Sequence, residues 1–292
     1  MRWLSLLLVL LSTPLAAQSE LEIVHRFDSE RPPGNIAIGP DGRLFMTLHE
    51  FYGKDLRVVE VLPDGSTRPY PDERWSQRPV GDGPGLYGVL GLNADRNGVL
   101  WLLDSGGADR AGRLVGWDTR AEKLHRIIYL GKPIIGDAPF LNDLAIDLDN
   151  QAIYVSDTAS PETAALIVVD LDTGRARRVL EGSPFTVPED VEMIIDGKSV
   201  TLGGAPARIG VNPITVDAEN EWVYFAPMSC ISMYRVRTRD LLDESLDESS
   251  LRERVERYGD KPLSDGSTVD SAGNVYITAI DANAIGVTRP DG

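Results

Sequence analysis

Four polar residues occupy the same place in four different repeats of the sequence. Each stands at the head of a short segment in which two apolar runs flank a polar turn, and the four are Asn35, Asn142, Asn212 and Asp265. Amide and carboxylate oxygens that converge on one point are the ligands preferred by a hard cation such as Ca²⁺. We therefore predict a divalent-metal site formed by these four side chains, with Ca²⁺ as the best-suited ion.

A carboxylate next to such a site could activate water. Asp265 belongs to the predicted ligand set, and Asp143 directly follows Asn142. A bound metal would polarise a lactone or ester carbonyl while Asp265 or Asp143 accepted a proton from water as general base. We therefore predict Asp265 and Asp143 as catalytic residues. The alternative is that these polar side chains cap strand ends and bind channel water without a metal.

Nucleophilic catalysis by a side chain finds no support in the sequence. It contains no Gly-x-Ser-x-Gly segment, and its three histidines have no Cys or Ser partner at a recognisable spacing. Cys230, the single cysteine, lies in an apolar strand-like region and is expected to be a buried, inert thiol. One cysteine cannot form an internal disulfide, so packing alone must hold the fold.

Five β-hairpins are predicted at the positions of the repeats. Their residues alternate between apolar and polar and meet at acidic or Gly/Asn turns, which is the pattern of a hairpin. The segments are Asn35–Thr47, Val89–Asp104, Asn142–Asp157, Asn212–Phe225 and Asp265–Thr278. Hairpins that recur every ~50–70 residues indicate a β-propeller with one hairpin per blade. The first strand of each blade lines a propeller's channel, so the four polar residues should converge at one mouth.

The fold class is therefore all-β, with four-stranded antiparallel blades. Segments such as Leu166–Asp170 supply third strands, and Asp240–Tyr258 is the one region with helical spacing. We expect a short helical insertion there, capped by Ser249 or Ser250 and running to about Tyr258. The alternating segment Leu21–Phe27 is expected to join the last blade and close the ring. The sequence ends inside its fifth repeat, so we expect the last blade to be incomplete.

Composition and the N-terminus indicate an exported protein. The chain of 292 residues carries a formal net charge of −16 and has a pI of about 4.6, which argues against nucleic acid as a partner. Arg2, the apolar run Trp3–Leu11 and small residues up to Ala17 read as a signal peptide, residues 1–17. Residues 18–292 would then form a single propeller domain, secreted or periplasmic, monomeric and free of the membrane after cleavage. Its partner would be a small-molecule ligand or substrate.

Several phrases are more specific than a generic propeller. They are Pro32–Gly42, Leu141–Asp149, Val223–Ser229 and Arg257–Gly266. These phrases resemble the bacterial members of the yellow/major royal jelly protein family and, more distantly, the gluconolactonase/SMP-30 propellers. The resemblance covers the chain from about Ile23 to its end, and it implies a six-bladed propeller of which five repeats are visible.

The resemblance also implies a metal site and a reaction. Lactonase-like propellers hold a divalent metal with one Glu, two Asn and one Asp at comparable blade positions. By motif matching, Asn142 and Asn212 fall on the Asn positions and Asp265 on the Asp position. Asn35 stands in place of the carboxylate, so the resemblance implies weaker metal binding than in those enzymes. The implied activity is metal-assisted hydrolysis of a lactone or ester.

A second function needs no chemistry. The resemblance equally implies a secreted, non-catalytic protein that binds small molecules such as aromatic amines in its channel. Aromatic residues in loops that precede the hairpins could line such a pocket mouth, and they are Trp75, Tyr87, Phe140 and Phe185. The acidic Asp190 lies nearby in the sequence, and a carboxylate beside aromatic rings suits a cationic amine. The alternative is that these rings pack between blades.

Overall fold

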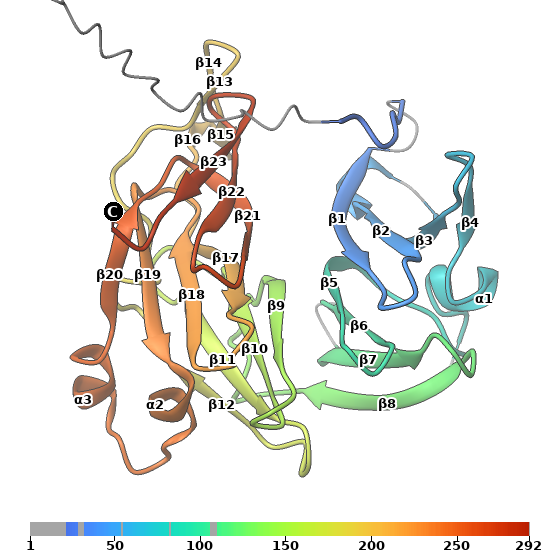
Figure 1. Ribbon diagram of the computed structural model, residues 1–292, viewed down its shortest axis with the longest axis horizontal. Helices are drawn as coiled ribbons and strands as arrows, with labels where there is room; N and C mark the ends of the chain where they lie inside the picture. The colour runs from blue at the N-terminus through green and yellow to red at the C-terminus, as the bar shows by residue number, and fades with distance from the viewer. Residues whose placement is uncertain (1–21, 29–31, 54, 82, 106–109, 292) are drawn as a thin grey trace, which may run out of the picture.

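Five antiparallel β-sheets surround a common axis in the computed structural model (Figure 1). The structure describes residues 22–28, 32–53, 55–81, 83–105 and 110–291. Four of the sheets have four strands and the fifth has three. Each predicted hairpin supplies the first two strands of one sheet, so the prediction of an all-β propeller with five visible blades and an incomplete last blade is confirmed.

The strands follow one another in chain order within each blade. The first blade contains β1 (Pro33–Ile38), β2 (Leu44–Leu48), β3 (Val58–Val61) and β4 (Thr67–Pro69). The second contains β5 (Val89–Ala94), β6 (Val99–Asp104), β7 (Gly112–Asp118) and β8 (Lys123–Leu130). The third contains β9 (Leu141–Asp147), β10 (Ala152–Asp157), β11 (Ala165–Asp170) and β12 (Ala176–Val179).

The last two blades are built in the same way. The fourth contains β17 (Val211–Val216), β18 (Trp222–Pro227), β19 (Ser232–Arg237) and β20 (Glu256–Asp260). The fifth contains β21 (Ser264–Val269), β22 (Val275–Ala279) and β23 (Ala284–Thr288). Two small hairpins precede the fourth blade, and they are β13 (Ile194–Ile195) with β14 (Lys198–Ser199) and β15 (Thr201–Leu202) with β16 (Ala205–Pro206). The inner strands β1, β5, β9, β17 and β21 pack side by side around the axis.

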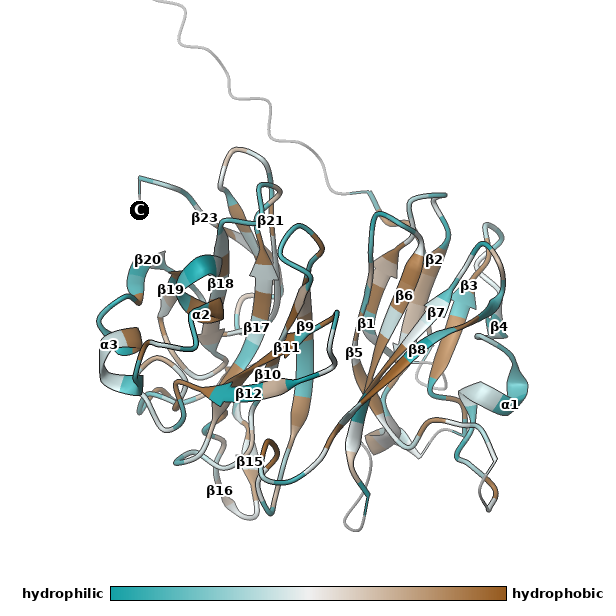
Figure 2. Ribbon diagram, turned by 90° about the horizontal axis from the view of Figure 1, so that it is seen from below, coloured by the Kyte–Doolittle hydropathy of each residue, from teal (hydrophilic) through white to brown (hydrophobic). Residues whose placement is uncertain are grey.

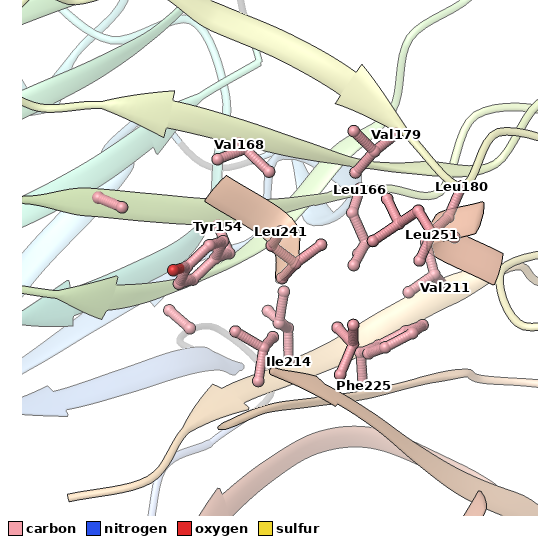
Figure 3. Packing of buried hydrophobic residues seen from close by; sticks show 14 of the residues in the cluster. Tyr154, Leu166, Val168, Val179, Leu180, Val211, Ile214, Phe225, Leu241 and Leu251 are labelled. Atoms are coloured by element: carbon pink, nitrogen blue, oxygen red, sulfur yellow. The ribbon is translucent and has the colours of Figure 1, made fainter. Parts of the chain in front are cut away.

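Aromatic side chains at one repeated position pack between neighbouring blades. The second strand of every blade carries an aromatic residue there: Phe45, Trp101, Tyr154 and Tyr224 are buried, and Tyr276 is 38% exposed. Tyr154 is fully buried and packs with Val211 and Ile214 of the next blade (Figure 3). Each such ring removes about 150–250 Å² of surface from water, which stacks the blades face to face. Apolar residues accordingly concentrate on the strands and polar ones on the turns (Figure 2).

The helical insertion is shorter than predicted. It consists of α2 (Thr238–Leu242) and α3 (Glu248–Arg252), and the carboxylate of Asp247 caps α3 by accepting the N–H of Ser250. The expected cap at Ser249 or Ser250 and the expected extension to Tyr258 are therefore wrong. Residues from Glu256 onward instead pair with β19 as the fourth strand of the blade. Two further short elements are α1 (Glu73–Ser76) and the 3₁₀ turn η1 (Glu50–Tyr52).

The N-terminal segment differs from its prediction as well. Residues 22–28 form no strand, and Phe27 packs beside the buried Met46 and Val59 of the first blade. The expected ring-closing strand is therefore replaced, over these residues, by a side-chain contact with the first blade. The predicted signal peptide, residues 1–17, lies outside the described residues. Within the described ranges, no helix is long and apolar enough to cross a membrane.

Candidate functional site

All five inner strands carry a β-bulge two residues from their start. In each blade, two residues of the first strand lie opposite one residue of the second. The bulged pairs are Gly34–Asn35, Leu90–Gly91, Asn142–Asp143, Asn212–Pro213 and Asp265–Gly266. A bulge leaves its extra residue outside the ladder and changes the direction of its side chain. Every predicted site residue therefore lies in a bulge next to the axis.

Hydroxyl groups on the second strands hold several of these bulges in place. Thr47 Oγ1 accepts the N–H of Asn35 at 2.8 Å and donates to the carbonyl oxygen of Leu90, in the next blade, at 3.1 Å. Ser156 Oγ repeats this arrangement between the N–H of Asp143 and the carbonyl of Asn212. Thr47 and Ser156 were not predicted from the sequence. Their signal was a hydroxyl residue close to the end of the second apolar run.

Two hydrogen bonds join the bulges across blades. Asn35 Nδ2 donates to Asp143 Oδ1 at 2.9 Å, which links the first and third blades. Asn212 Nδ2 donates to Asp265 Oδ1 at 2.7 Å, which links the fourth and fifth. Asp143 also lies close enough to Asp265 for their charges to interact. We call these four residues, Asn35, Asp143, Asn212 and Asp265, the axial cluster.

Asn142 is the first residue of its bulge, as Asn212 and Asp265 are of theirs, whereas Asn35 and Asp143 are the second. In the bulge of β9 it is the carboxylate of Asp143, and not the side chain of the half-buried Asn142, that accepts the hydrogen bond from Asn35. Gly91 makes room for this arrangement. A Cβ atom at Gly91 would lie 2.6 Å from the Asn142 carbonyl oxygen and 3.1 Å from Asp143 Oδ1. The second blade therefore has no side chain at the bulge position equivalent to those of Asn35 and Asp143, and these two residues bond to each other across it.

Burial changes the pKa of one carboxyl in the axial cluster, that of Asp143. The Asp143 side chain is buried, and this raises the pKa of its carboxyl to about 7. The N–H of Leu144 lowers this pKa, the charge of Asp265 raises it, and the amide of Asn35 lowers it. Near neutral pH, the Asp143 carboxyl is thus close to half ionised, so it can accept or donate a proton there.

One polar atom of the cluster is unsatisfied. Asn212 is 2% exposed, and its Oδ1 has no hydrogen-bond partner among the described residues. A buried acceptor without a donor is unusual and calls for a cation, a water or a ligand group. The described part of the chain holds no group of three or more His, Cys, Asp or Glu residues suited to a metal. A cation at the axis would therefore rely on carboxylate and amide oxygens, which form a donor set that fits a hard ion.

Most of the predicted pocket aromatics pack elsewhere. Trp75 contacts Trp117 edge-on at 5.6 Å, and Phe185 contacts Tyr234 at 5.1 Å, in both cases against a buried core cluster. The ring of Tyr87 lies under the guanidinium of Arg110. Asp190 forms an ion pair with Arg208. Phe140 is different, because its ring lies nearly parallel to that of the exposed Phe51, with the centroids 6.1 Å apart.

Residues 87–291, which are most of the chain, match the family model described as Major royal jelly protein. The chain belongs to the major royal jelly protein family. Major royal jelly protein 1 of Apis mellifera is 23% identical over 265 residues, covering 84% of this chain and 59% of that relative. Major royal jelly protein 3 of Apis mellifera is 23% identical over 197 residues, covering 63% of this chain and 34% of the relative. This member of the family thus spans only part of the length of these relatives.

Solved propellers of other families have a similar fold. A gluconolactonase from Xanthomonas campestris matches with a TM-score of 0.55 and 14% identity, covering 89% of this chain and 73% of that one. A luciferin-regenerating enzyme matches with a TM-score of 0.52 and 11% identity, covering 89% and 72%. At these identities the likeness shows the propeller fold alone.

Proposed function

We propose that this royal jelly family member hydrolyses a small lactone or ester with the help of a divalent metal at the axial cluster. The observation that carries the proposal is the unsatisfied Oδ1 of the buried Asn212, next to the Asp265 carboxylate. A cation between these oxygens would satisfy the amide and offset the repulsion between Asp143 and Asp265. The gluconolactonase with the same fold adds support by analogy only.

The residues divide into ligands and a base. Asn35, Asn142, Asn212 and Asp265 would hold the metal, preferentially Ca²⁺. When bound, such a metal polarises a carbonyl group. Asp143 is proposed as the general base, because burial brings its pKa to about 7, within the range useful for proton transfer near neutral pH. It would take a proton from water as the water oxygen bonds to the carbonyl carbon, and then return it to the departing alkoxide oxygen. Asp265, which is exposed, is the second candidate for this role.

The competing function is small-molecule binding without chemistry. The observation in its favour is the stacked pair Phe51–Phe140, with Phe51 63% exposed. A cationic aromatic amine could lie on such rings with its ammonium group near Asp265. In either case we propose a protein exported by the signal peptide at residues 1–17, with residues 18–292 forming one monomeric domain that binds neither nucleic acid nor membrane.

A metal titration tests the first function. Ca²⁺, Mn²⁺ and Zn²⁺ are titrated by calorimetry into the metal-stripped protein, the Asp265→Ala variant and the control Asp137→Ala, whose carboxylate is 93% exposed. Binding with a micromolar Kd that is lost in Asp265→Ala and kept in Asp137→Ala would support the axial metal and justify a screen of lactones. No binding to the intact protein would overturn the metal mechanism.

A further inference from the structure

A second connection links the two blades that Asn35 and Asp143 join. Phe51 lies in η1, three residues after the end of β2, and Phe140 immediately precedes β9. Their rings are inclined by 17° with centroids 6.1 Å apart. The first and third blades are thus connected twice, by a polar contact within the bulges and by an aromatic contact in the loops next to them. The ring pair lies next to the starts of β1 and β9, the ends of these strands at which the bulges lie.

His49 lies between the polar contact in the bulges and the aromatic contact in the loops. A Cβ at Gly34, the bulge residue next to Asn35, would lie 3.2 Å from Cδ2 of His49, so the imidazole rests against this bulge. The same imidazole lies 4.7 Å from the ring of Phe51 and 6.3 Å from that of Tyr52. We call His49, Phe51, Tyr52 and Phe140 the aromatic arch. It begins at the Asn35 bulge and ends beside the strand that carries Asp143.

Two of the four rings of the aromatic arch are exposed to solvent. Phe51 and Tyr52 are 63% and 62% exposed, whereas the aromatic residues that join the blades, such as Tyr154, are buried. Single exposed apolar residues are common, but neighbouring exposed aromatic rings near a polar cluster are typical of a binding site. Gly91 has no side chain at the bulge position that lies between those of Asn35 and Asp143. A ligand on the arch could therefore extend toward Asn35 and Asp143.

We infer that the aromatic arch binds the planar ring of a neutral, aromatic lactone or aryl ester and directs its carbonyl group toward the axial cluster. The near-parallel arrangement of Phe51 and Phe140 offers flat ring faces, which favour an aromatic ring over a saturated one. A polyhydroxylated sugar lactone would need hydrogen-bond donors and acceptors on this rim instead of phenyl groups. The inference names the substrate class of the proposed hydrolase, and it rests on that proposed function only for the hydrolysis step.

Ligand binding can be tested without any turnover. The probes are 3,4-dihydroquinolin-2-one, a lactam that mimics a benzo-fused lactone, and δ-valerolactam, which lacks the aromatic ring. Their Kd values are measured by calorimetry or by ligand-detected NMR for the intact protein, Phe51→Ala and the control Tyr129→Ala. Tyr129 is 64% exposed on β8, in the outermost strand of the second blade, so the control also removes an exposed ring. Both substitutions are at exposed positions and leave the core untouched.

Phe51→Ala is expected to weaken binding of the benzo-fused lactam about tenfold, because one stacked ring contributes about that factor. It should change the Kd of δ-valerolactam less than twofold, and Tyr129→Ala should change neither. Equal effects on both lactams, or no effect of Phe51→Ala, would overturn the inference. Phe51-dependent binding of tyramine without binding of the neutral lactam would also overturn it, in favour of an amine ligand.

Hydrolysis separates this inference from the proposed function. The kcat/KM for dihydrocoumarin and for δ-valerolactone is compared in the metal-loaded protein and in Phe51→Ala. A preference for dihydrocoumarin that falls about tenfold in the variant supports both proposals. Phe51-dependent lactam binding without hydrolysis of either lactone removes the hydrolase function and leaves the aromatic ligand class in place.

Discussion

Asp143 is the residue on which the chemistry of the site depends most. Its carboxyl is buried and its pKa is raised to about 7, chiefly by burial, whereas an unfolded chain ionises it near pH 4. Between these values the folded protein holds a proton that the unfolded chain has lost. The free energy of unfolding should therefore decrease as the pH rises from about 4 to 7, and remain lower above that range.

Asp143→Asn should remove this pH dependence. The amide keeps an oxygen for the N–H groups of Asn35 and Leu144 but does not ionise, so the variant should be about 1–3 kcal/mol more stable than the wild type at pH 8. At pH 4.5 the two proteins should be nearly equal. Urea unfolding in EDTA at both pH values measures the difference, and parallel pH profiles for the two proteins would contradict the prediction. Hydrolytic activity, if present, should be lost in the variant.

The sequence alone could locate this site but could not select between neighbours. Asn35, Asn212 and Asp265 are recognisable because each heads a repeat, and the structure places all three beside the axis. The sequence predicted a role for both Asn142 and Asp143, but it could not show which of the two bonds to Asn35, because a β-bulge breaks the strict alternation of side chains along a strand. The hydroxyls of Thr47 and Ser156 bond to backbone N–H and C=O groups. Every residue type can supply such backbone partners, so the sequence gives little indication of these contacts.

At the level of elements, the five bulges decide how closely the inner strands approach one another. Among the glycines of the inner strands, Gly91 lies closest to the backbone of a neighbouring strand. Its added Cβ would lie 2.6 Å from the backbone oxygen of Asn142 and 2.8 Å from the Asp143 Cα, atoms that no side-chain rotation can move. Gly91→Ala should therefore push β5 away from β9 and destabilise the protein by about 1–3 kcal/mol. It should also disturb the carboxyl of Asp143.

Gly136→Ala provides the matched control. An added Cβ at Gly136 has no atom within 4 Å, so this variant should be within about 0.5 kcal/mol of the wild type. Chemical denaturation of the two variants side by side gives the comparison. If Gly91→Ala were as stable as Gly136→Ala, the close approach of β5 and β9 would not be a constraint on the fold.

The strands of the hairpins could be predicted from the sequence. The helix could not be predicted correctly, because pairing with a neighbouring strand overrides the local helical spacing. The hairpins were clear because alternation and turn residues agree with each other. The helical spacing near residues 248–258 was misleading. Leu251 and Val255 do pack against a core cluster, but Arg257 pairs with Tyr234 of β19, which turns the end of the expected helix into a strand. Local propensity is a weak guide when a sheet edge lies nearby.

Over the whole molecule, the two ends of the row of blades expose apolar strand faces. On β1, Ile36 and Ile38 are 57% and 67% exposed. On the fifth blade, Ile285 and Val287 are 48% and 45% exposed. The hydroxyl of Thr278, in the fifth blade, likewise has no partner in a following blade among the described residues. Its Oγ1 bonds to Gly266 in its own blade, whereas Thr47 and Ser156 each donate to the following blade.

The repeated aromatic position allows an inner blade and the last blade to be compared by mutation. Tyr154 and Tyr276 occupy equivalent places, and each hydroxyl donates to the aspartate of its own hairpin turn, Asp147 or Asp270. Tyr154 is fully buried against the fourth blade, but Tyr276 is 38% exposed. Tyr154→Ala should therefore lower the free energy of unfolding by about 3–5 kcal/mol, and Tyr276→Ala by about 1 kcal/mol.

Because the hydrogen bonds within the two blades are alike, the difference between these variants measures what a neighbouring blade contributes to one aromatic side chain. Urea denaturation of both variants, followed by tryptophan fluorescence and by circular dichroism, gives the two values. Losses of equal size would mean that Tyr276 is covered in solution as fully as Tyr154 is by the fourth blade. A small loss for Tyr276→Ala alone would show that the stability of each blade comes mainly from the blade it packs against, with little from its own strands.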